Sequence, residues 1–170
     1  ALGYMALGLW QRNEAMSMGY ALASQRGHTP TRLEAKPSFA NILVWKVVYE
    51  TDGHFYVDAV RAGLAPRVFY GTSVEKLDIQ RDLPWLSQDS QQARDVERFR
   101  WFSNDYLARS PEFNDRVIDI RYSMLPNEVA PLWSIQLDPQ AKDNEHVIYR
   151  THRDSDTGKT AQLWKMLSAP

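Results

Sequence analysis

The segment from Asn41 to Arg61 constrains the fold of this chain more than any other. Its first ten residues alternate with the period of two that an extended strand shows, and apolar side chains occur on both faces. Asp52-Gly53 is a strong signal for a tight turn, and Phe55–Arg61 is the expected returning strand. A strand that is apolar on both faces is typical of a central position, covered above and below. This segment predicts a β-hairpin inside a layered fold.

Helical and extended periods alternate along the rest of the chain. The spacing of apolar residues predicts a helix over 1–27 that ends at a left-handed Gly27, and Asp89 with Gln92 resembles a capping pair for a middle helix. Polar connectors are expected at 29–31 and 36–38, further strands at 67–72, 117–122, 133–137 and 145–151, and a short closing helix at 157–167 that buries Leu163, Trp164 and Leu167. We expect an α+β fold in the order αβββαβββα, with these three helices on an antiparallel sheet of about six strands.

Size and charge restrict the class of protein. A chain of 170 residues is long enough for one domain with a sizeable core. Twenty Lys and Arg against 21 Asp and Glu argue against a nucleic-acid-binding stripe, and the lack of cysteine excludes disulfides, thiolate zinc sites and a cysteine nucleophile. No run reaches the ~18 apolar residues of a membrane span, although Ala1–Trp10 carries no charge. We expect 1–170 to be a single soluble domain of a larger membrane protein, with 1–27 as a juxtamembrane helix.

The four histidines give little support for a metal site. His54, at the predicted turn beside two aspartates, is the one candidate ligand, and a solvated turn is the alternative. His28 follows the expected end of the first helix, where an imidazolium would meet the negative end of the helix dipole. His146 and His152 are predicted on one strand, roughly 20 Å apart, which is too far to share an ion.

Asp119 and Arg121 are the most specific polar pair in the chain. Both are expected on the same face of one strand, where they could pair with each other, with a neighbouring strand or with a ligand. They are therefore candidates for a catalytic role. Arg100, Asp105 and Arg109 are expected on the middle helix as a solvated face.

Six Trp, eight Tyr and six Phe form a heavy aromatic content. Such residues mainly fill a core, but some could line a ligand groove, for which Trp45, Tyr49 and Trp101 are the candidates. The sequence contains no nucleophile elbow, phosphate-binding glycine loop or zinc-protease helix. Ser103 and Ser134 have no neighbouring histidine that would mark a nucleophile.

Four segments together resemble a known family. They contain GLWQ and QRGH in the first helix, NILVWKV at 41–47, RWFS at 100–103 and VIDIRY at 117–122. In this order, and over residues 4 to about 137, they resemble the soluble C-terminal domain of the inner-membrane metal-dependent hydrolases, also called LexA-binding membrane-associated hydrolases. The resemblance implies that the histidine-rich motif and any divalent metal belong to an N-terminal membrane portion. No cofactor is therefore expected in this domain.

Three functions follow from these observations. The first is an extramembrane accessory or ligand-sensing domain that contacts its own N-terminal membrane domain, on a side of the membrane that the sequence leaves open. The second is a small hydrolase with a pocket between the sheet and the middle helix, using Asp119, Arg121 and either His146 or His152. The third is an interaction module that forms a homodimer through the first helix. None of these functions involves a nucleic acid.

Overall fold

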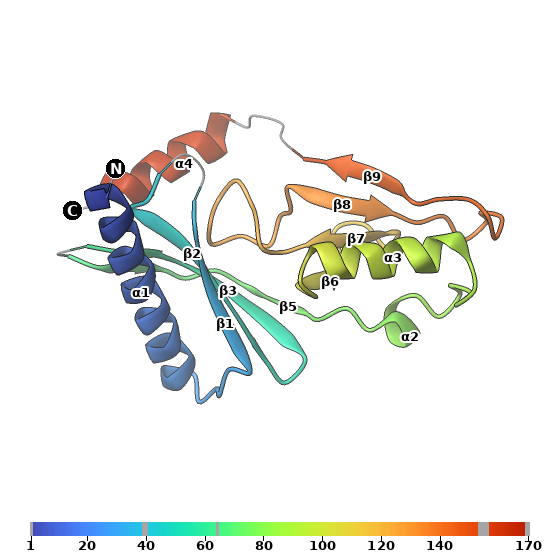
Figure 1. The fold of residues 1–170 in the computed structure, drawn as a ribbon, viewed down its shortest axis with the longest axis horizontal. Coiled ribbons are helices and arrows are strands. Elements are labelled where there is room, and N and C mark those ends of the chain that lie inside the picture. Colours follow the sequence, from blue (N-terminus) through green and yellow to red (C-terminus); the bar gives the residue numbers. More distant parts are fainter. Residues whose placement is uncertain (1, 39–40, 64, 153–156, 169–170) are drawn as a thin grey trace.

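The computed structural model describes residues 2–38, 41–63, 65–152 and 157–168. Within them the chain is an α+β protein with four helices and two antiparallel sheets (Figure 1). The elements, in chain order, are α1 (Leu2–Gln25), β1 (Arg32–Pro37), β2 (Val44–Thr51), β3 (His54–Arg61), β4 (Arg67–Phe69), β5 (Ser73–Glu75), α2 (Ile79–Asp82), α3 (Gln91–Phe102), β6 (Leu107–Arg109), β7 (Arg116–Asp119), β8 (Trp133–Gln136), β9 (Ile148–Thr151) and α4 (Thr157–Ser168). The expected class is confirmed, and so is the general sequence of helix, strands, helix, strands and helix, although α2 and three of the nine strands were not expected.

The two halves of the chain share one layout. α1 is followed by an antiparallel meander, β1-β2-β3-β4, whose third strand also pairs with β5. α3 is followed by a second meander, β6-β7-β8-β9. A single bridge between Lys76 and Ala108 connects the two sheets. The strands therefore form one five-stranded and one four-stranded sheet, whereas the sequence predicted one sheet of about six strands. The number was underestimated because several strands are too short for their period to be visible in the sequence.

The first half is built around β2. Val47 and Tyr49 of β2 pack toward α1, while Val44 and Val48 face the opposite side, so the predicted two-sided burial is confirmed. α1 lies close to this sheet at Gly19, where any added side chain would meet Val47. The helix ends as predicted at a left-handed Gly27, and two backbone hydrogen bonds close its last turn.

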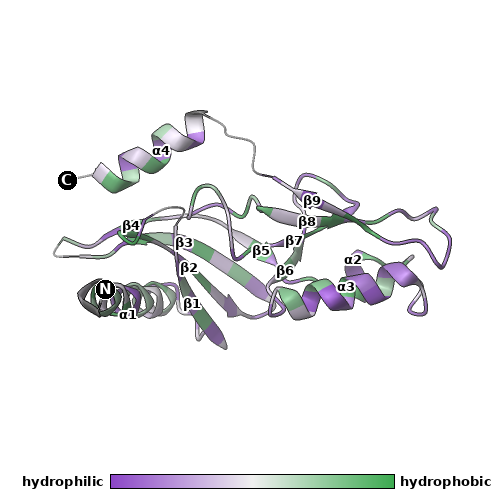
Figure 2. Cartoon of the chain, turned by 45° about the horizontal axis from the view of Figure 1, so that its top comes forward, coloured by the Kyte–Doolittle hydropathy of each residue, from purple (hydrophilic) through white to green (hydrophobic). Residues whose placement is uncertain are grey.

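The second half repeats this packing with α3. Ser90, one residue after the predicted Asp89, caps α3 by accepting a hydrogen bond from the backbone of Ala93. Val96 and Phe99 then pack on the sheet together with buried residues of β6, β7 and β8. α1 and α3 lie on the same side of the two sheets, and α4 lies on the opposite side (Figure 2).

Several local predictions were wrong. β1 covers the stretch between the two expected polar connectors and also Lys36 and Pro37 of the second connector, because all six of its residues pair with β2. Asp105 and Arg109 lie beyond α3, which ends at Phe102, so they do not form one helical face with Arg100. In α4 Met166 is buried, whereas Trp164 is exposed.

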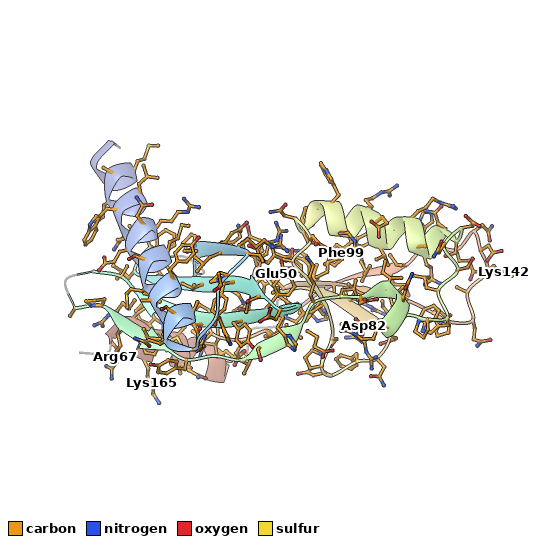
Figure 3. The ribbon with its side chains drawn as sticks, turned by 90° about the horizontal axis from the view of Figure 1, so that it is seen from below. Glu50, Arg67, Asp82, Phe99, Lys142 and Lys165 are labelled. Atoms are coloured by element: carbon orange, nitrogen blue, oxygen red, sulfur yellow. The ribbon has the colours of Figure 1, made fainter. Side chains whose placement is uncertain are left out.

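The two halves meet through an apolar cluster and a charged network. Phe55 of the first sheet packs against Tyr106 and Ile118 of the second half. At the same junction Lys76 forms ion pairs with Glu50 (2.9 Å) and with Asp105 (2.6 Å). Glu50 is labelled near the middle of the molecule in Figure 3. None of the described helices has both the length and the apolar character that crossing a bilayer requires.

Candidate ligand-binding cleft

Asp119 and Arg121 form an ion pair with each other, one of the arrangements that the sequence allowed. Asp119 is the last residue of β7 and is fully buried, and Arg121 Nη2 lies 2.7 Å from its Oδ2. Burial alone would lower the pKa of Arg121, but the hydrogen bonds and the charge of Asp119 outweigh burial and raise this pKa. Arg121 also donates from Nη2 to the carbonyl of Phe102. These contacts hold Arg121 against the end of β7 and the end of α3. Arg121 also lines the cleft described below.

Lys46 of β2 is the unusual residue of this cleft. Its side chain lies on the sheet face opposite α1, and only 3% of the residue is exposed. Its Nζ donates to Ser123 Oγ (2.8 Å) and to the carbonyl of Glu128 (2.6 Å). Burial lowers the pKa of Lys46 to about 7, against the opposing charges of Asp119 and Glu128. At neutral pH this lysine is therefore poised between its charged and uncharged forms.

A cleft of about 600 Å³ opens beside Lys46 and Arg121. Its walls are mostly apolar, and the rings of Tyr122 and Trp133 meet edge to face with centroids 5.4 Å apart. Polar groups are few, and besides the two cations they include Ser38 and Ser123, of which Ser123 accepts a hydrogen bond from Lys46. The other walls are Pro37, Met124, Pro126 and Leu132. A concave, largely apolar surface with a few convergent polar groups is the usual form of a small-molecule site.

The three aromatic candidates do not converge on this cleft. Trp45 is buried under α1 and donates from its indole to the carbonyl of Ile42 (2.8 Å). It lines a neighbouring groove between α1 and β1, which shares Pro37 and Tyr122 with the cleft. Tyr49 is fully buried, and Trp101 is 84% exposed at the end of α3.

Tyr49 instead belongs to a polar and aromatic cluster under the end of α1. Its ring stacks on Tyr56, with centroids 5.0 Å apart, and its hydroxyl lies 2.9 Å from His28 Nδ1. Arg26 forms two hydrogen bonds with the buried Asp58 (2.6 and 2.9 Å), and these bonds raise the pKa of Arg26. Besides any interaction with the helix dipole, His28 thus fixes the end of α1 to β2.

The predicted metal candidate does not gather ligands. His54 lies at the turn between β2 and β3, its Nδ1 is 3.0 Å from the carbonyl of Asp52, and Glu75 is 3.8 Å from its Nε2. Asp58 lies elsewhere, paired with Arg26. Over residues 2–38, 41–63, 65–152 and 157–168, no group of three or more His, Asp or Glu side chains is arranged to hold a metal ion.

The other two histidines flank β9 rather than lie within it. His146 precedes the strand and is 2.8 Å from the buried carboxylate of Asp95. His152 follows the strand, and its Nε2 lies 2.7 Å from Ser134 Oγ. The prediction that Ser134 has no histidine partner was therefore wrong, because strand pairing brings together residues that are 18 positions apart.

Sequence reasoning also missed Lys46, Ser123 and Trp133 as residues of one site. The signal available for Lys46 was a lysine within the otherwise apolar run 42–49. Ser123 and Trp133 carry no such signal, because they reach the cleft from a loop and from the start of β8.

Comparison with known proteins identifies no relative of this chain. No protein-family model matches it, and neither the curated proteins nor the solved structures gave a significant match. The resemblance to the inner-membrane hydrolases stays a prediction.

Proposed function

We propose that this chain is an extramembrane accessory domain that senses a small organic anion, bound in the cleft beside Lys46. The observation that carries the proposal is a buried lysine with a lowered pKa at the wall of an apolar cleft. A buried ammonium is costly unless it is paired, so a site of this kind favours a ligand that supplies a negative charge.

The hydrogen-bonding capacity of the two cations supports this ligand class. Charged Lys46 has three N–H donors, and two of them are used by Ser123 and Glu128. Within the described residues, Nη1 of Arg121 makes no hydrogen bond. Lys46 and Arg121 therefore retain hydrogen-bond donors for the carboxylate or phosphate group of a ligand. Tyr122, Trp133 and the other apolar walls suit the apolar part of the same ligand.

The pKa of Lys46 gives the binding a defined pH dependence. An anion favours the charged form, so binding raises the pKa of Lys46 and takes up a proton near pH 7. Affinity is then highest below pH 7 and falls as the pH rises through 7. For a ligand that contacts Nζ directly, the fall approaches tenfold per pH unit at its steepest.

Attachment to the bacterial inner membrane is the second part of the proposal. The first ten residues of the chain carry no charge, and Met5, Leu7, Leu9 and Trp10 on α1 are exposed. An uncharged helical segment with exposed apolar side chains suits contact with a membrane portion of the same protein. This part rests on the sequence resemblance as well as on these side chains.

Calorimetric titration with decanoate tests the proposed ligand class, with decanol as a neutral molecule of the same chain length. Decanoate is expected to bind with a stoichiometry near one, and decanol at least tenfold more weakly. Lys46→Met should remove this preference, whereas Lys142→Met, at the exposed far end of the molecule, should keep it (Figure 3). Equal binding of both probes, or unchanged preference in Lys46→Met, would exclude the proposal.

A further inference from the structure

A second pocket lies on the face of the sheet β6-β7-β8-β9 that α3 does not cover. Val117 and Ile135 pack toward α3, so Ser134, next to Ile135 in β8, points to the opposite face. Ser134 pairs with Arg150 of β9, and His152 lies two residues further along the chain. Strand register therefore places the side chains of Ser134 and His152 on the same face.

The two side chains have the geometry of a nucleophile and its base. Ser134 Oγ is 2.7 Å from His152 Nε2, within the distance that proton transfer requires. Ser134 is held in the middle of a paired strand and is 1% exposed. The backbone of His152 is fixed as well, because its N–H donates to the carbonyl of Leu132 (2.9 Å).

Both side chains line a pocket of about 310 Å³. Its apolar walls include Ile118, Met124 and Pro131, and Met124 also borders the cleft beside Lys46. The pocket is large enough for a small acyl group and its leaving group. The earlier expectation of a site between the sheet and the middle helix does not fit, because buried side chains fill that space.

Arg116 adds a positive charge with unused hydrogen-bonding capacity. Its guanidinium carbon stacks 3.8 Å from the ring centroid of Phe113, and both residues line the pocket. Its Nε is buried and has no hydrogen-bond partner in the described part of the chain, the nearest carboxylate being that of Asp115 at 3.9 Å. A cation placed in this way favours negative charge on a bound oxygen.

We propose that Ser134 and His152 hydrolyse small carboxylic esters in this pocket. Ser134 Oγ attacks the ester carbonyl carbon while its proton passes to His152 Nε2. The bond to the leaving alcohol breaks, and the alcohol leaves with that proton. Water then attacks the acyl-serine, gives one proton to His152 and releases the carboxylic acid, and that proton returns to Ser134 Oγ. Arg116 lines the same pocket, so its positive charge stabilises the oxygen that becomes negative in both steps.

Covalent labelling of the unaltered chain with a fluorophosphonate tests this proposal without relying on any variant. The serine oxygen displaces fluoride from phosphorus, and peptide mass spectrometry locates the adduct. We expect the adduct on Ser134. In parallel, p-nitrophenyl acetate hydrolysis by Ser134→Ala and by His152→Gln should fall by about 100-fold or more. Ser73→Ala, on an exposed strand position, and His54→Gln, at an exposed turn, are the matched controls and should retain full activity.

The outcomes separate a catalytic pair from a structural hydrogen bond. An adduct on Ser134, together with loss of hydrolysis in folded Ser134→Ala, supports the proposal. An adduct on another residue, no adduct, or hydrolysis that survives in Ser134→Ala overturns it. Each result is independent of decanoate binding, because the labelled pair and Lys46 belong to different cavities.

Discussion

Replacing Lys46 with methionine should change how the stability of the protein depends on pH. The pKa of Lys46 falls from its ordinary 10.5 to about 7 in the folded protein because the side chain is buried. Between these two values the unfolded chain binds more protons than the folded one, so the free energy of unfolding rises with pH. One pKa unit corresponds to about 1.4 kcal/mol, so the whole interval corresponds to about 5 kcal/mol.

The measurement compares urea unfolding of both proteins at pH 7 and at pH 9. Over this range the free energy of unfolding of the wild type should rise by about 2 kcal/mol relative to that of Lys46→Met, because methionine does not titrate. Other groups titrate in both proteins, so their effects cancel in the difference. Methionine also leaves the Glu128 carbonyl without the Lys46 hydrogen bond, which costs about 1–3 kcal/mol at any pH and does not affect the comparison.

A second variant identifies the source of the effect. Lys142→Met removes an exposed lysine. The difference in unfolding free energy between this variant and the wild type should be constant between pH 7 and pH 9. If the difference in unfolding free energy between the wild type and Lys46→Met is also constant over this range, Lys46 keeps an ordinary pKa and the reasoning from its burial is wrong.

Four further substitutions test the packing. Gly71→Ala should destabilise the protein by about 3 kcal/mol or more in urea unfolding, because the new Cβ would collide with two backbone carbonyl oxygens; Gly8→Ala, where nothing lies within 4 Å, should instead stabilise α1 by about 0.5–1 kcal/mol. Ser90→Ala should cost about 1 kcal/mol through loss of the α3 cap, measured by the same method, and no change would contradict that role. Asp58→Asn should lower the unfolding free energy by about 2–3 kcal/mol by weakening the bonds to Arg26, and an unchanged thermal midpoint would refute this.

Local patterns predicted the long elements of the fold well. The hairpin of β2 and β3 follows from a long alternating run and a clear turn, and α1 ends at the expected glycine. β1 escaped prediction because Leu33 and Ala35 are its only apolar residues before the proline that ends it. Proline is tolerated there because β1 is the outermost strand of its sheet.

The candidate sites were harder to predict because they depend on contacts between distant residues. Lys46 and Ser123 are 77 positions apart, and the loop that carries Ser123 has no sequence period. Ser134 and His152 meet only through the register of β8 and β9. The sequence did indicate the Asp119–Arg121 pair, but as two residues on one strand face, whereas β7 ends at Asp119 and Arg121 reaches back to it from the following turn.

The most direct test of the ligand-binding proposal is the titration of the Lys46 side chain by NMR, with and without decanoate, in protein labelled at the lysine ε-carbon. The signal is assigned by its loss in Lys46→Met. We predict a pKa of about 7 in the free protein and a higher pKa when decanoate is bound. A pKa that decanoate leaves unchanged would contradict the proposal that the ligand's charge lies beside Lys46.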